Sequence, residues 1–185
     1  MQLSVVILNY NVKYFIDVCI QSVLAATKDL DAEVILVDNA SEDGSVEWIS
    51  QQFPQVKQIN NSENVGFPKG NNIGVAQAKG EFLCILNPDT VVAEDTFTSA
   101  ISFIENNKQV AIMGPKLIDG SGTFLKESKR GVPTPAVAFS KVAGLYKIAP
   151  KLFGKYYNLR LSKNTSGPTD ILVGAFMFMR TAHYR

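Results

Sequence analysis

The sequence predicts an α/β protein with a doubly wound, mostly parallel central sheet and helices on both faces. Two observations carry this prediction. Short β-branched apolar runs alternate with segments of helical periodicity, and polar clusters directly follow three of those runs. A length of 185 residues with 46% hydrophobic residues is enough for one globular core. We therefore expect a single domain over residues 1–185.

The expected elements follow one another in alternation. Residues 3–8 form a continuous apolar run, typical of a strand that is buried on both faces. A helix is predicted at 13–27, because its apolar side chains recur at helical spacing on a face that would pack on the sheet. Those side chains are Phe15, Val18, Cys19 and Val23. Further strands are predicted at 33–37, 56–59 and 82–86, and further helices at 41–53, 66–79 and 95–106.

The regular alternation ends after the last of these helices. A strand is predicted at 110–118, a hairpin turn at 118–123 from its Asp-Gly-Ser-Gly composition, and a final strand at 169–180. Residues 131–168 contain four prolines and are predicted to form an irregular or helical excursion from the domain.

The composition excludes several classes of protein. A formal charge of +1, from 18 basic and 17 acidic side chains, predicts no nucleic-acid partner. No apolar run reaches the length of a membrane-spanning helix. Cys19 and Cys84 are too few for a secreted disulfide framework. We expect a cytoplasmic protein, at the inner face of the membrane if it touches lipid at all.

Polar clusters at 9–11, 38–41 and 87–90 follow three of the predicted strands. Doubly wound sheets bind ligands outside the carboxyl ends of their strands, so these clusters mark the expected site. The first cluster reads Asn-Tyr-Asn, which excludes the G-x-G-x-x-G turn of dinucleotide oxidoreductases, and the sequence holds no P-loop either.

The side chains in these clusters suit a nucleoside diphosphate. The Tyr10 ring can stack on a base, and the Asp38 carboxylate can accept from a base N–H or a ribose hydroxyl. Asp89 can face a diphosphate only through a divalent cation such as Mg²⁺ or Mn²⁺. Simple turn or capping roles are open for Asp38 and Asp89, and a helix cap is expected for Asp43.

Four segments together resemble the successive motifs of family 2 glycosyltransferases with the GT-A fold. They are SVVILNYN at 4–11, VDNASEDGS at 37–45, NVGFPKGNNIG at 64–74 and LNPDT at 86–90. The Asn-Pro-Asp-Thr form, with GAFMFMR at 174–180, resembles the branch that contains rhamnosyl-transferring enzymes of bacterial polysaccharide assembly. The resemblance spans nearly the whole chain except 131–168.

The resemblance implies an enzyme that moves a sugar from a nucleoside diphosphate sugar to a glycan or lipid-linked acceptor by inverting, direct displacement. Tyr10 would stack near the base, Asp38 would bind base or ribose, and Asp89 would hold the Mg²⁺ or Mn²⁺ that bridges the phosphates. The implied nucleotide-binding residues are Asn9, Tyr10, Asn11, Asp38, Asn39, Ser41, Asn64, Gly66, Phe67, Lys69, Asn71 and Asp89.

The chain departs from this resemblance in three ways. Asn87 takes the first place of the Asp-x-Asp pair of many relatives, which leaves Asp89 as the one metal carboxylate. Asn71 stands where many relatives carry an arginine, and Lys69 offers a nearby charge instead. The acidic general base of the family lies downstream of the 174–180 motif, and the chain ends at Arg185. A general base contributes roughly 10²- to 10⁴-fold to rate. We therefore expect a truncated chain that binds nucleotide with little or no transfer, and assign no catalytic residue.

Two other functions stay open at this point: a non-catalytic nucleotide-sugar-binding module and a sugar-phosphate nucleotidyltransferase. The second expects a glycine-rich basic loop after the first strand, where this chain has Asn-Tyr-Asn. Residues 147–163 mix aromatic and basic side chains. We expect this segment either to pack on the sheet as a helix or to make a peripheral contact with an anionic membrane.

Overall fold

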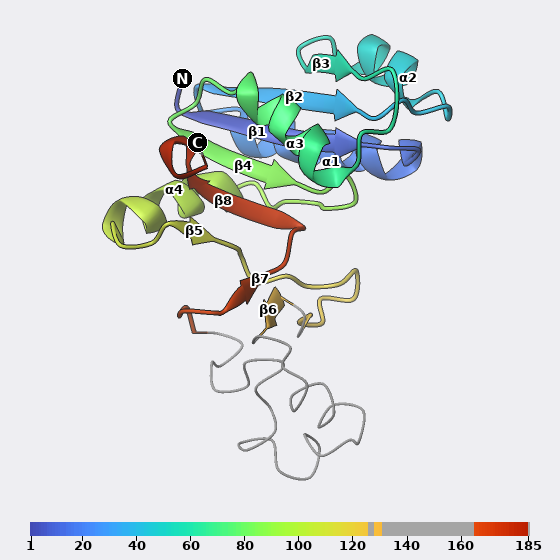
Figure 1. The fold of residues 1–185 in the computed structure, drawn as a ribbon. Coiled ribbons are helices and arrows are strands. Elements are labelled where there is room, and N and C mark those ends of the chain that lie inside the picture. Colours follow the sequence, from blue (N-terminus) through green and yellow to red (C-terminus); the bar gives the residue numbers. More distant parts are fainter. Residues whose placement is uncertain (126–127, 131–164, 185) are drawn as a thin grey trace. The chain divides into compact units, whose positions relative to one another are not determined.

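The computed structural model describes residues 1–125, 128–130 and 165–184. The chain divides into two compact units, residues 1–113 with 174–185 and residues 114–173. The first unit contains a six-stranded sheet in the order β3-β2-β1-β4-β8-β5 (Figure 1). The excursion predicted at 131–168 falls in the second unit. Its residues 131–164, and with them the proposed membrane contact at 147–163, lie outside the described residues.

Four strands form the parallel part of the sheet. They are β1 (Leu3–Asn9), β2 (Ala32–Asp38), β3 (Lys57–Asn60) and β4 (Phe82–Leu86). β1 lies between β2 and β4, and β3 pairs with β2. Asn9 lies opposite Asp38, and Asp38 lies opposite Asn60. The polar residues at the carboxyl ends of three strands therefore meet at one edge of the sheet, and the predicted mostly parallel sheet is confirmed.

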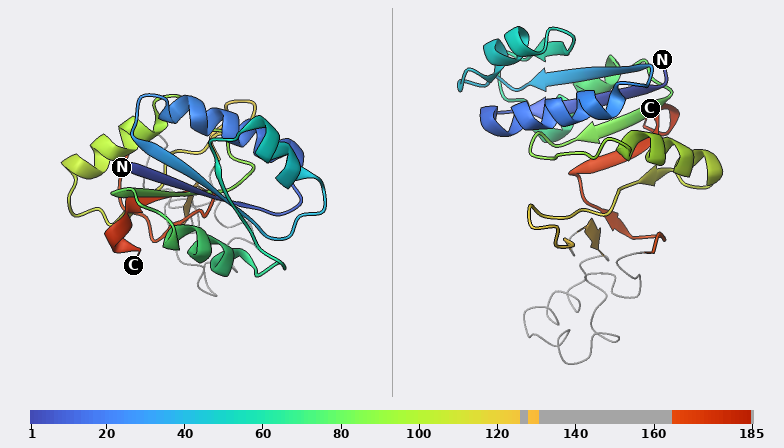
Figure 2. Two further views of the ribbon diagram at one scale, coloured as in Figure 1. Left: turned by 90° about the horizontal axis from the view of Figure 1, so that it is seen from above. Right: turned by 180° about the vertical axis from the view of Figure 1, so that it is seen from behind.

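Helices cover both faces of this sheet, as predicted. α1 (Lys13–Thr27), α2 (Ser45–Gln52) and α4 (Thr96–Asn106) lie on one face, and α3 (Phe67–Ala76) lies on the other (Figure 2). Strand side chains alternate between the two apolar layers: Val5 packs under α1, whereas Val6 packs under α3.

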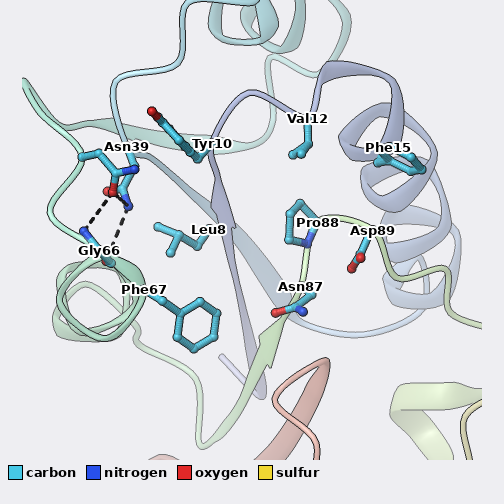
Figure 3. A pocket seen from close by; sticks show the side chains of 11 residues that line it. Leu8, Tyr10, Val12, Phe15, Asn39, Gly66, Phe67, Asn87, Pro88 and Asp89 are labelled. Carbon is cyan, nitrogen blue, oxygen red and sulfur yellow. Dashed lines mark hydrogen bonds between the residues drawn. The ribbon is translucent and has the colours of Figure 1, made fainter.

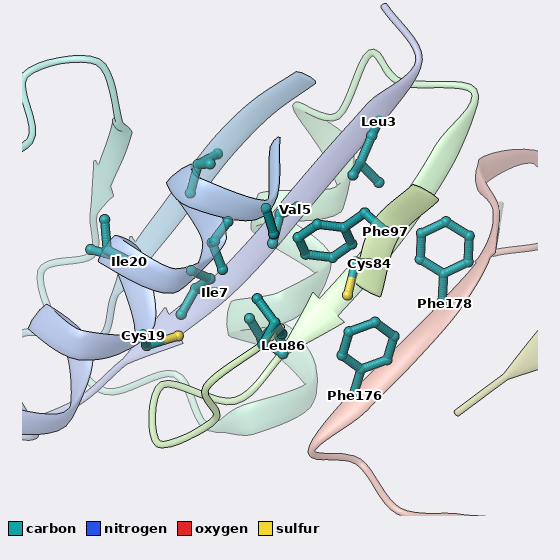
Figure 4. Close-up of a cluster of buried hydrophobic side chains, with 14 of the residues drawn as sticks. Leu3, Val5, Ile7, Cys19, Ile20, Cys84, Leu86, Phe97, Phe176 and Phe178 are labelled. Carbon is teal, nitrogen blue, oxygen red and sulfur yellow. The ribbon is translucent and has the colours of Figure 1, made fainter. Parts of the chain in front are cut away.

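Three aromatic rings, those of Phe97, Phe176 and Phe178, lie among aliphatic side chains in one apolar layer of the first unit (Figure 4). Phe97 of α4 stacks on Phe176 at 6.0 Å between ring centroids. The ring centroid of Phe178 lies 6.4 Å from that of Phe176 and 5.7 Å from that of Phe82 in β4. These contacts fix the strand that carries Phe176 against the centre of the sheet.

The buried face of α1 differs from the predicted one. The α1 residues that are fully buried are Ile16, Cys19, Ile20 and Val23. Phe15 is 61% exposed and Val18 is 49% exposed. The four buried residues follow the i, i+3, i+4, i+7 repeat of a helix, so Phe15 and Val18 lie outside the stripe that packs on the sheet.

Two predicted strands are shorter than expected. β8 (Phe176–Arg180) runs antiparallel to β4 and pairs on its other side with β5 (Ile112–Met113). The chain leaves the sheet after β5 at a Gly-Pro pair, because proline has no N–H to donate to a ladder. A turn at 174–175 separates β8 from β7 (Ile171–Leu172).

The second unit contains β7 paired antiparallel with β6 (Lys129–Arg130). The predicted hairpin turn also lies there and is confirmed, with a bridge between Ile118 and Phe124. Hydrogen bonds from Ser121 and Thr123 hold the pKa of Asp119 below its ordinary value. Among the described residues, no helix is long and apolar enough to cross a membrane.

Candidate functional site

A pocket of about 520 Å³ lies in the first unit at the carboxyl ends of β1 and β4 (Figure 3). Its wall comes from the end of β1, the start of α1, the loops after β2 and β4, and the segment that leads into α3. The lining residues are Leu8, Tyr10, Val12, Phe15, Asn39, Asn64, Gly66, Phe67, Asn87, Pro88 and Asp89. This placement agrees with the edge that the polar clusters predicted.

Aromatic rings and uncharged amides make up much of the pocket wall. The side chains of Tyr10, Phe15 and Phe67 are 47%, 61% and 48% exposed, so their ring surfaces are available to a ligand. Three asparagine amides also line the wall. Asp89 is the one charged side chain among the lining residues, and it is exposed. Such a wall suits a planar, uncharged ring system, with one anionic point at its edge.

The structure brings only part of the predicted set to this pocket. The predicted nucleotide-binding residues that line it are Tyr10, Asn39, Asn64, Gly66, Phe67 and Asp89. The predicted residues that do not line it are Asn9, Asn11, Asp38, Ser41, Lys69 and Asn71. The ligand roles of both groups stay predictions, but the members of the second group other than Lys69 make hydrogen bonds within the protein.

A buried hydrogen-bond network joins the loops after β1 and β2. Asn9 Nδ2 donates to Asp38 Oδ1 at 2.7 Å and to Ser45 Oγ at 2.7 Å. The Asp38 carboxylate also accepts from the Ser41 amide at 2.8 Å and from the Ser41 hydroxyl at 2.6 Å. Asp38 is 1% exposed, so its carboxylate is used within the protein and holds this edge of the sheet.

Asn11 turns the chain between β1 and α1. Its φ of 53° lies in the left-handed region, which asparagine tolerates better than most residues. The backbone N–H of Asn11 donates to Ser41 Oγ at 3.0 Å, and the side-chain oxygen Asn11 Oδ1 accepts from the backbone N–H of Glu42 at 2.8 Å. Asn11 therefore fixes the loop that carries Tyr10.

Asn39 connects the loop after β2 to the segment before α3. Its Nδ2 donates to Asn64 Oδ1 at 3.1 Å, and its Oδ1 accepts from Asn61 Nδ2 at 2.9 Å. Asn64 Oδ1 also accepts from the Gly66 amide at 2.9 Å. Asn39 and Asn64 line the pocket, and these internal hydrogen bonds limit the donors and acceptors that the two amides offer to a ligand.

Two glycines let α3 lie close to the sheet. A Cβ at Gly70 would lie 2.5 Å from Leu8 Cδ1, and a Cβ at Gly74 would lie 2.5 Å from Val6 Cγ1. The helix begins after Gly66, whose φ of 82° favours glycine. This close packing carries the first residue of the helix, Phe67, to the pocket.

The two remaining predicted residues lie on α3. Lys69 is exposed in the first turn of the helix. Asn71 is 2% exposed, and its Nδ2 donates to the Phe67 carbonyl at 2.9 Å. The buried Asn71 Oδ1 has no hydrogen-bond partner within the part of the chain that the structure describes.

A tight turn after β4 presents Asp89. The backbone N–H of Thr90 donates to the backbone carbonyl of Asn87 at 3.2 Å. The backbone N–H of Asn87 donates to the backbone carbonyl of Ala175 at 2.9 Å. The Cys19 thiol donates to the same Asn87 carbonyl at 3.6 Å. Burial, with a smaller contribution from the Asp89 charge, raises the pKa of Cys19 to about 12, so this thiol is protonated at neutral pH.

Asp43 caps the starts of two helices at once, as its sequence context predicted for one of them. Its carboxylate accepts from the Lys13 amide of α1 at 2.8 Å and from the Ser45 amide of α2 at 3.0 Å. Burial by itself would raise the pKa of Asp43, but hydrogen bonds from Ser45 and Lys13 outweigh it and lower the pKa.

Replacing Asp43 with alanine is expected to lower the free energy of unfolding by roughly 0.5–1 kcal/mol at neutral pH, the scale of a lost cap that is partly exposed. The folded pKa lies below the ordinary value, so this stabilisation is complete above about pH 4 and disappears as the pH falls through the folded pKa. Urea unfolding at neutral pH and at about pH 3 measures the effect. Glu42→Ala, which removes the neighbouring exposed carboxylate, is the control. A loss of stability that is equal at both pH values would contradict the capping role.

Comparison with protein families decides the class of this chain. The model of the family described as "Glycosyl transferase family 2" matches residues 4–185. The chain belongs to this family.

Its relatives in family 2 are considerably longer proteins. The poly(ribitol-phosphate) β-N-acetylglucosaminyltransferase TarS of Staphylococcus aureus is 26% identical over 171 residues, which cover 89% of this chain and 29% of TarS. The minor teichoic acid biosynthesis protein GgaB of Bacillus subtilis is 32% identical over 111 residues, which cover 57% of this chain and 12% of GgaB. The chain thus corresponds to less than a third of either relative.

Solved structures establish the fold of this family 2 chain. The crystal structure of S. aureus TarS 1-349 superposes with a TM-score of 0.61 at 22% identity, over 98% of this chain and 48% of that one. The mannosyltransferase PcManGT of Pyrobaculum calidifontis superposes with a TM-score of 0.62 at 19% identity, over 97% of this chain and 44% of that one. The predicted GT-A fold, a mostly parallel sheet flanked by helices, is confirmed.

Three residues that line the pocket were not predicted from the sequence: Leu8, Val12 and Phe15. Asn87 and Pro88 also line it, and they lie in the predicted cluster at 87–90, although they were assigned no binding role. Val12 directly follows the first polar cluster, so proximity in sequence was an available signal for it. Phe15 was missed because its apolar character placed it on the buried face of α1.

Proposed function

We propose that this family 2 chain binds a nucleoside diphosphate sugar in the pocket and serves its transfer to a glycan or lipid-linked acceptor. The pocket carries the proposal: it combines exposed aromatic rings, amides and one exposed carboxylate at the strand ends. Structures of TarS with UDP and with UDP-GlcNAc support a nucleotide-sugar donor. The name of GgaB supports a role in cell-surface polymer synthesis.

The lining residues suggest how the nucleotide would be held. We assign base stacking to the exposed Tyr10 ring, because the π-face of tyrosine pairs with planar bases. The uncharged wall around Asn39 and Asn64 suits the base and ribose, which carry no charge. Asp89 is the one charged residue that lines the pocket, and we assign it to the diphosphate end of the nucleotide.

A divalent cation is the natural partner for Asp89 at that end. The described residues contain no group of three or more His, Cys, Asp or Glu side chains that forms a metal site by itself. Mg²⁺ sites at nucleotides often use only one or two carboxylates, and phosphates complete the coordination, so a single exposed carboxylate fits this type of site. The structure of PcManGT with GDP-Man and Mn²⁺ supports the assignment. When bound, the cation would neutralise negative charge on the departing nucleotide.

The proposed transfer is a direct, inverting displacement. The acceptor oxygen forms a bond to the anomeric carbon as the bond to the diphosphate breaks, and the acceptor proton passes to a general base. With Asp89 committed to the diphosphate, we assign no base among the described residues. The Asn-Pro-Asp-Thr motif makes a dTDP sugar of the rhamnosyl type one donor to test beside UDP and GDP sugars.

A nucleotide panel tests this proposal on residues 1–185. At a ligand concentration about 100 times Kd, the matching nucleoside diphosphate is expected to raise Tm by roughly 5–10 °C through mass action. UDP, dTDP and GDP are each measured with Mn²⁺ and with EDTA. The larger shift is expected with Mn²⁺, because Asp89 contacts the diphosphate through the cation.

The matching nucleoside without phosphates serves as the control. It is expected to give a small shift that is the same with Mn²⁺ and with EDTA, since it offers no oxygen ligands to a bridging cation. The proposal fails if none of the three diphosphates shifts Tm under either condition.

A further inference from the structure

Helix α1 supports the turn that carries Asp89 from its buried side. The Cys19 thiol donates to the backbone carbonyl of Asn87 at 3.6 Å, within the range for a sulfur donor, and the backbone amide of Thr90 donates to the same carbonyl at 3.2 Å. Cys19 is fully buried, so its thiol is held in place by the surrounding core. One side chain of α1 therefore bonds to the same carbonyl that closes the four-residue turn.

A second α1 residue holds the chain just beyond this turn. Ser22 Oγ accepts from the Val92 amide at 3.2 Å and donates to the Cys19 carbonyl at 2.8 Å. Cys19 and Ser22 lie three positions apart, so they share one side of the helix. The segment 87–92 is thus fixed to α1 at both of its ends.

The opposite side of the turn is fixed by the chain before β8. The Ala175 carbonyl accepts from the Asn87 amide at 2.9 Å and from Thr90 Oγ1 at 3.4 Å. The peptide groups of Asn87 are therefore held from two directions, by Ala175 at the N–H and by Cys19 at the C=O. Asp89 follows two residues later, and its side chain is the only exposed acid of the pocket wall.

We propose that Cys19 is a positioning residue for Asp89: its thiol sets the Asn87–Thr90 turn so that the Asp89 carboxylate reaches a cation on a bound nucleoside diphosphate. This inference rests on the proposed function. Cys19 itself touches no ligand, because it is fully buried and does not line the pocket. Coordination by Mg²⁺ or Mn²⁺ depends on short, fixed distances, so a small shift of the turn lowers cation affinity.

Cys84 provides a matched control for a test of this role. It is also a fully buried free cysteine of the same apolar layer, but it lies within β4 and makes no hydrogen bond to the turn. Cys19→Ala and Cys84→Ala each remove one buried sulfur. Both variants are therefore expected to lose stability, whereas only Cys19→Ala removes a hydrogen bond to the Asn87 carbonyl, which then keeps the Thr90 amide as its donor.

The measurement is the Mn²⁺ affinity of each variant in the presence of saturating nucleoside diphosphate, read from the EPR signal of free Mn²⁺. We expect Cys19→Ala to raise the Mn²⁺ Kd about 10-fold, the scale seen when an outer support of a metal ligand is removed. Cys84→Ala is expected to leave the Mn²⁺ Kd unchanged. Nucleotide affinity in EDTA is expected to be the same for both variants and the wild type.

A double-variant cycle separates positioning from a general structural effect. In an Asp89→Asn background, Cys19→Ala is expected to cause no further loss of Mn²⁺ affinity, because its effect passes through the Asp89 carboxylate. Cys19→Ser replaces the thiol donor with a hydroxyl donor and stays closer to cysteine in volume than alanine does, so it is expected to retain part of the Mn²⁺ affinity. It supplies the test if Cys19→Ala does not fold.

Three results would overturn the inference: an unchanged Mn²⁺ Kd in the Cys19 variants, an equal loss in Cys84→Ala, or a further loss in the Asp89→Asn background. A different result separates this inference from the function beneath it. If the wild type binds no nucleoside diphosphate with Mn²⁺ or with EDTA, the proposed function fails, and the positioning role fails with it.

Discussion

Asp89→Asn is expected to weaken Mn²⁺-dependent nucleoside diphosphate binding about 100-fold, the scale of losing one partner of a close charge pair. The substitution keeps the size of the side chain and one oxygen but removes the only charge among the pocket-lining residues. Binding in EDTA is expected to change little, because without a cation the carboxylate only repels the phosphates. Isothermal titration with the matching diphosphate, in Mn²⁺ and in EDTA, measures both values.

Glu94→Gln is the control for this prediction. Glu94 is another exposed acid on the chain between β4 and α4, and it does not line the pocket. Its substitution changes the net charge by the same amount, so a general electrostatic effect would appear in both variants. Full Mn²⁺ dependence in Asp89→Asn would contradict the assignment of Asp89 to the cation.

Gly80→Ala is expected to lower the free energy of unfolding by about 3 kcal/mol, the upper end of the usual cost of overpacking. A Cβ at Gly80 would lie 2.4 Å from the Ser4 amide nitrogen, 2.5 Å from the Leu3 carbonyl carbon and 2.8 Å from the Phe82 carbonyl oxygen. These are backbone atoms of β1 and β4, so relief requires the two central strands to separate. Urea unfolding followed by far-UV circular dichroism measures the loss.

Gly174→Ala is the matched control in the same unit. The nearest atom to a Cβ there is Phe67 Cζ at 4.0 Å, which is ordinary van der Waals contact. Its expected effect on stability is within about 0.5 kcal/mol, as for most substitutions without a clash. Equal stability of the Gly80→Ala and Gly174→Ala variants would contradict this prediction, because it would mean that the backbone of β1 and β4 next to Gly80 moves aside at little cost.

The sequence predicts the buried parallel strands and the polar residues at their carboxyl ends for the same reason. A strand covered on both faces leaves an uninterrupted apolar run, as at residues 3–8, and the polar residues that end such runs stand out by contrast. Strands at the margin of the sheet leave weaker signals. β5 pairs through only Ile112 and Met113, so the longer apolar stretch around it overstated its length.

The sequence by itself determined the α/β class, the family motifs and the edge at which the polar clusters meet. Only the tertiary structure decided which polar residues line the pocket and which are hydrogen-bonded within the protein. The parallel register sets Asn9 opposite Asp38, and α2 brings Ser45 to the same point, so Asn9 Nδ2 donates to both Asp38 and Ser45 in the core. Asp89 lies on a turn held by its backbone atoms, which leaves its side chain exposed at the pocket. The two acids are similar in sequence context, and the difference between them arises because a buried carboxylate requires hydrogen-bond partners that distant segments supply.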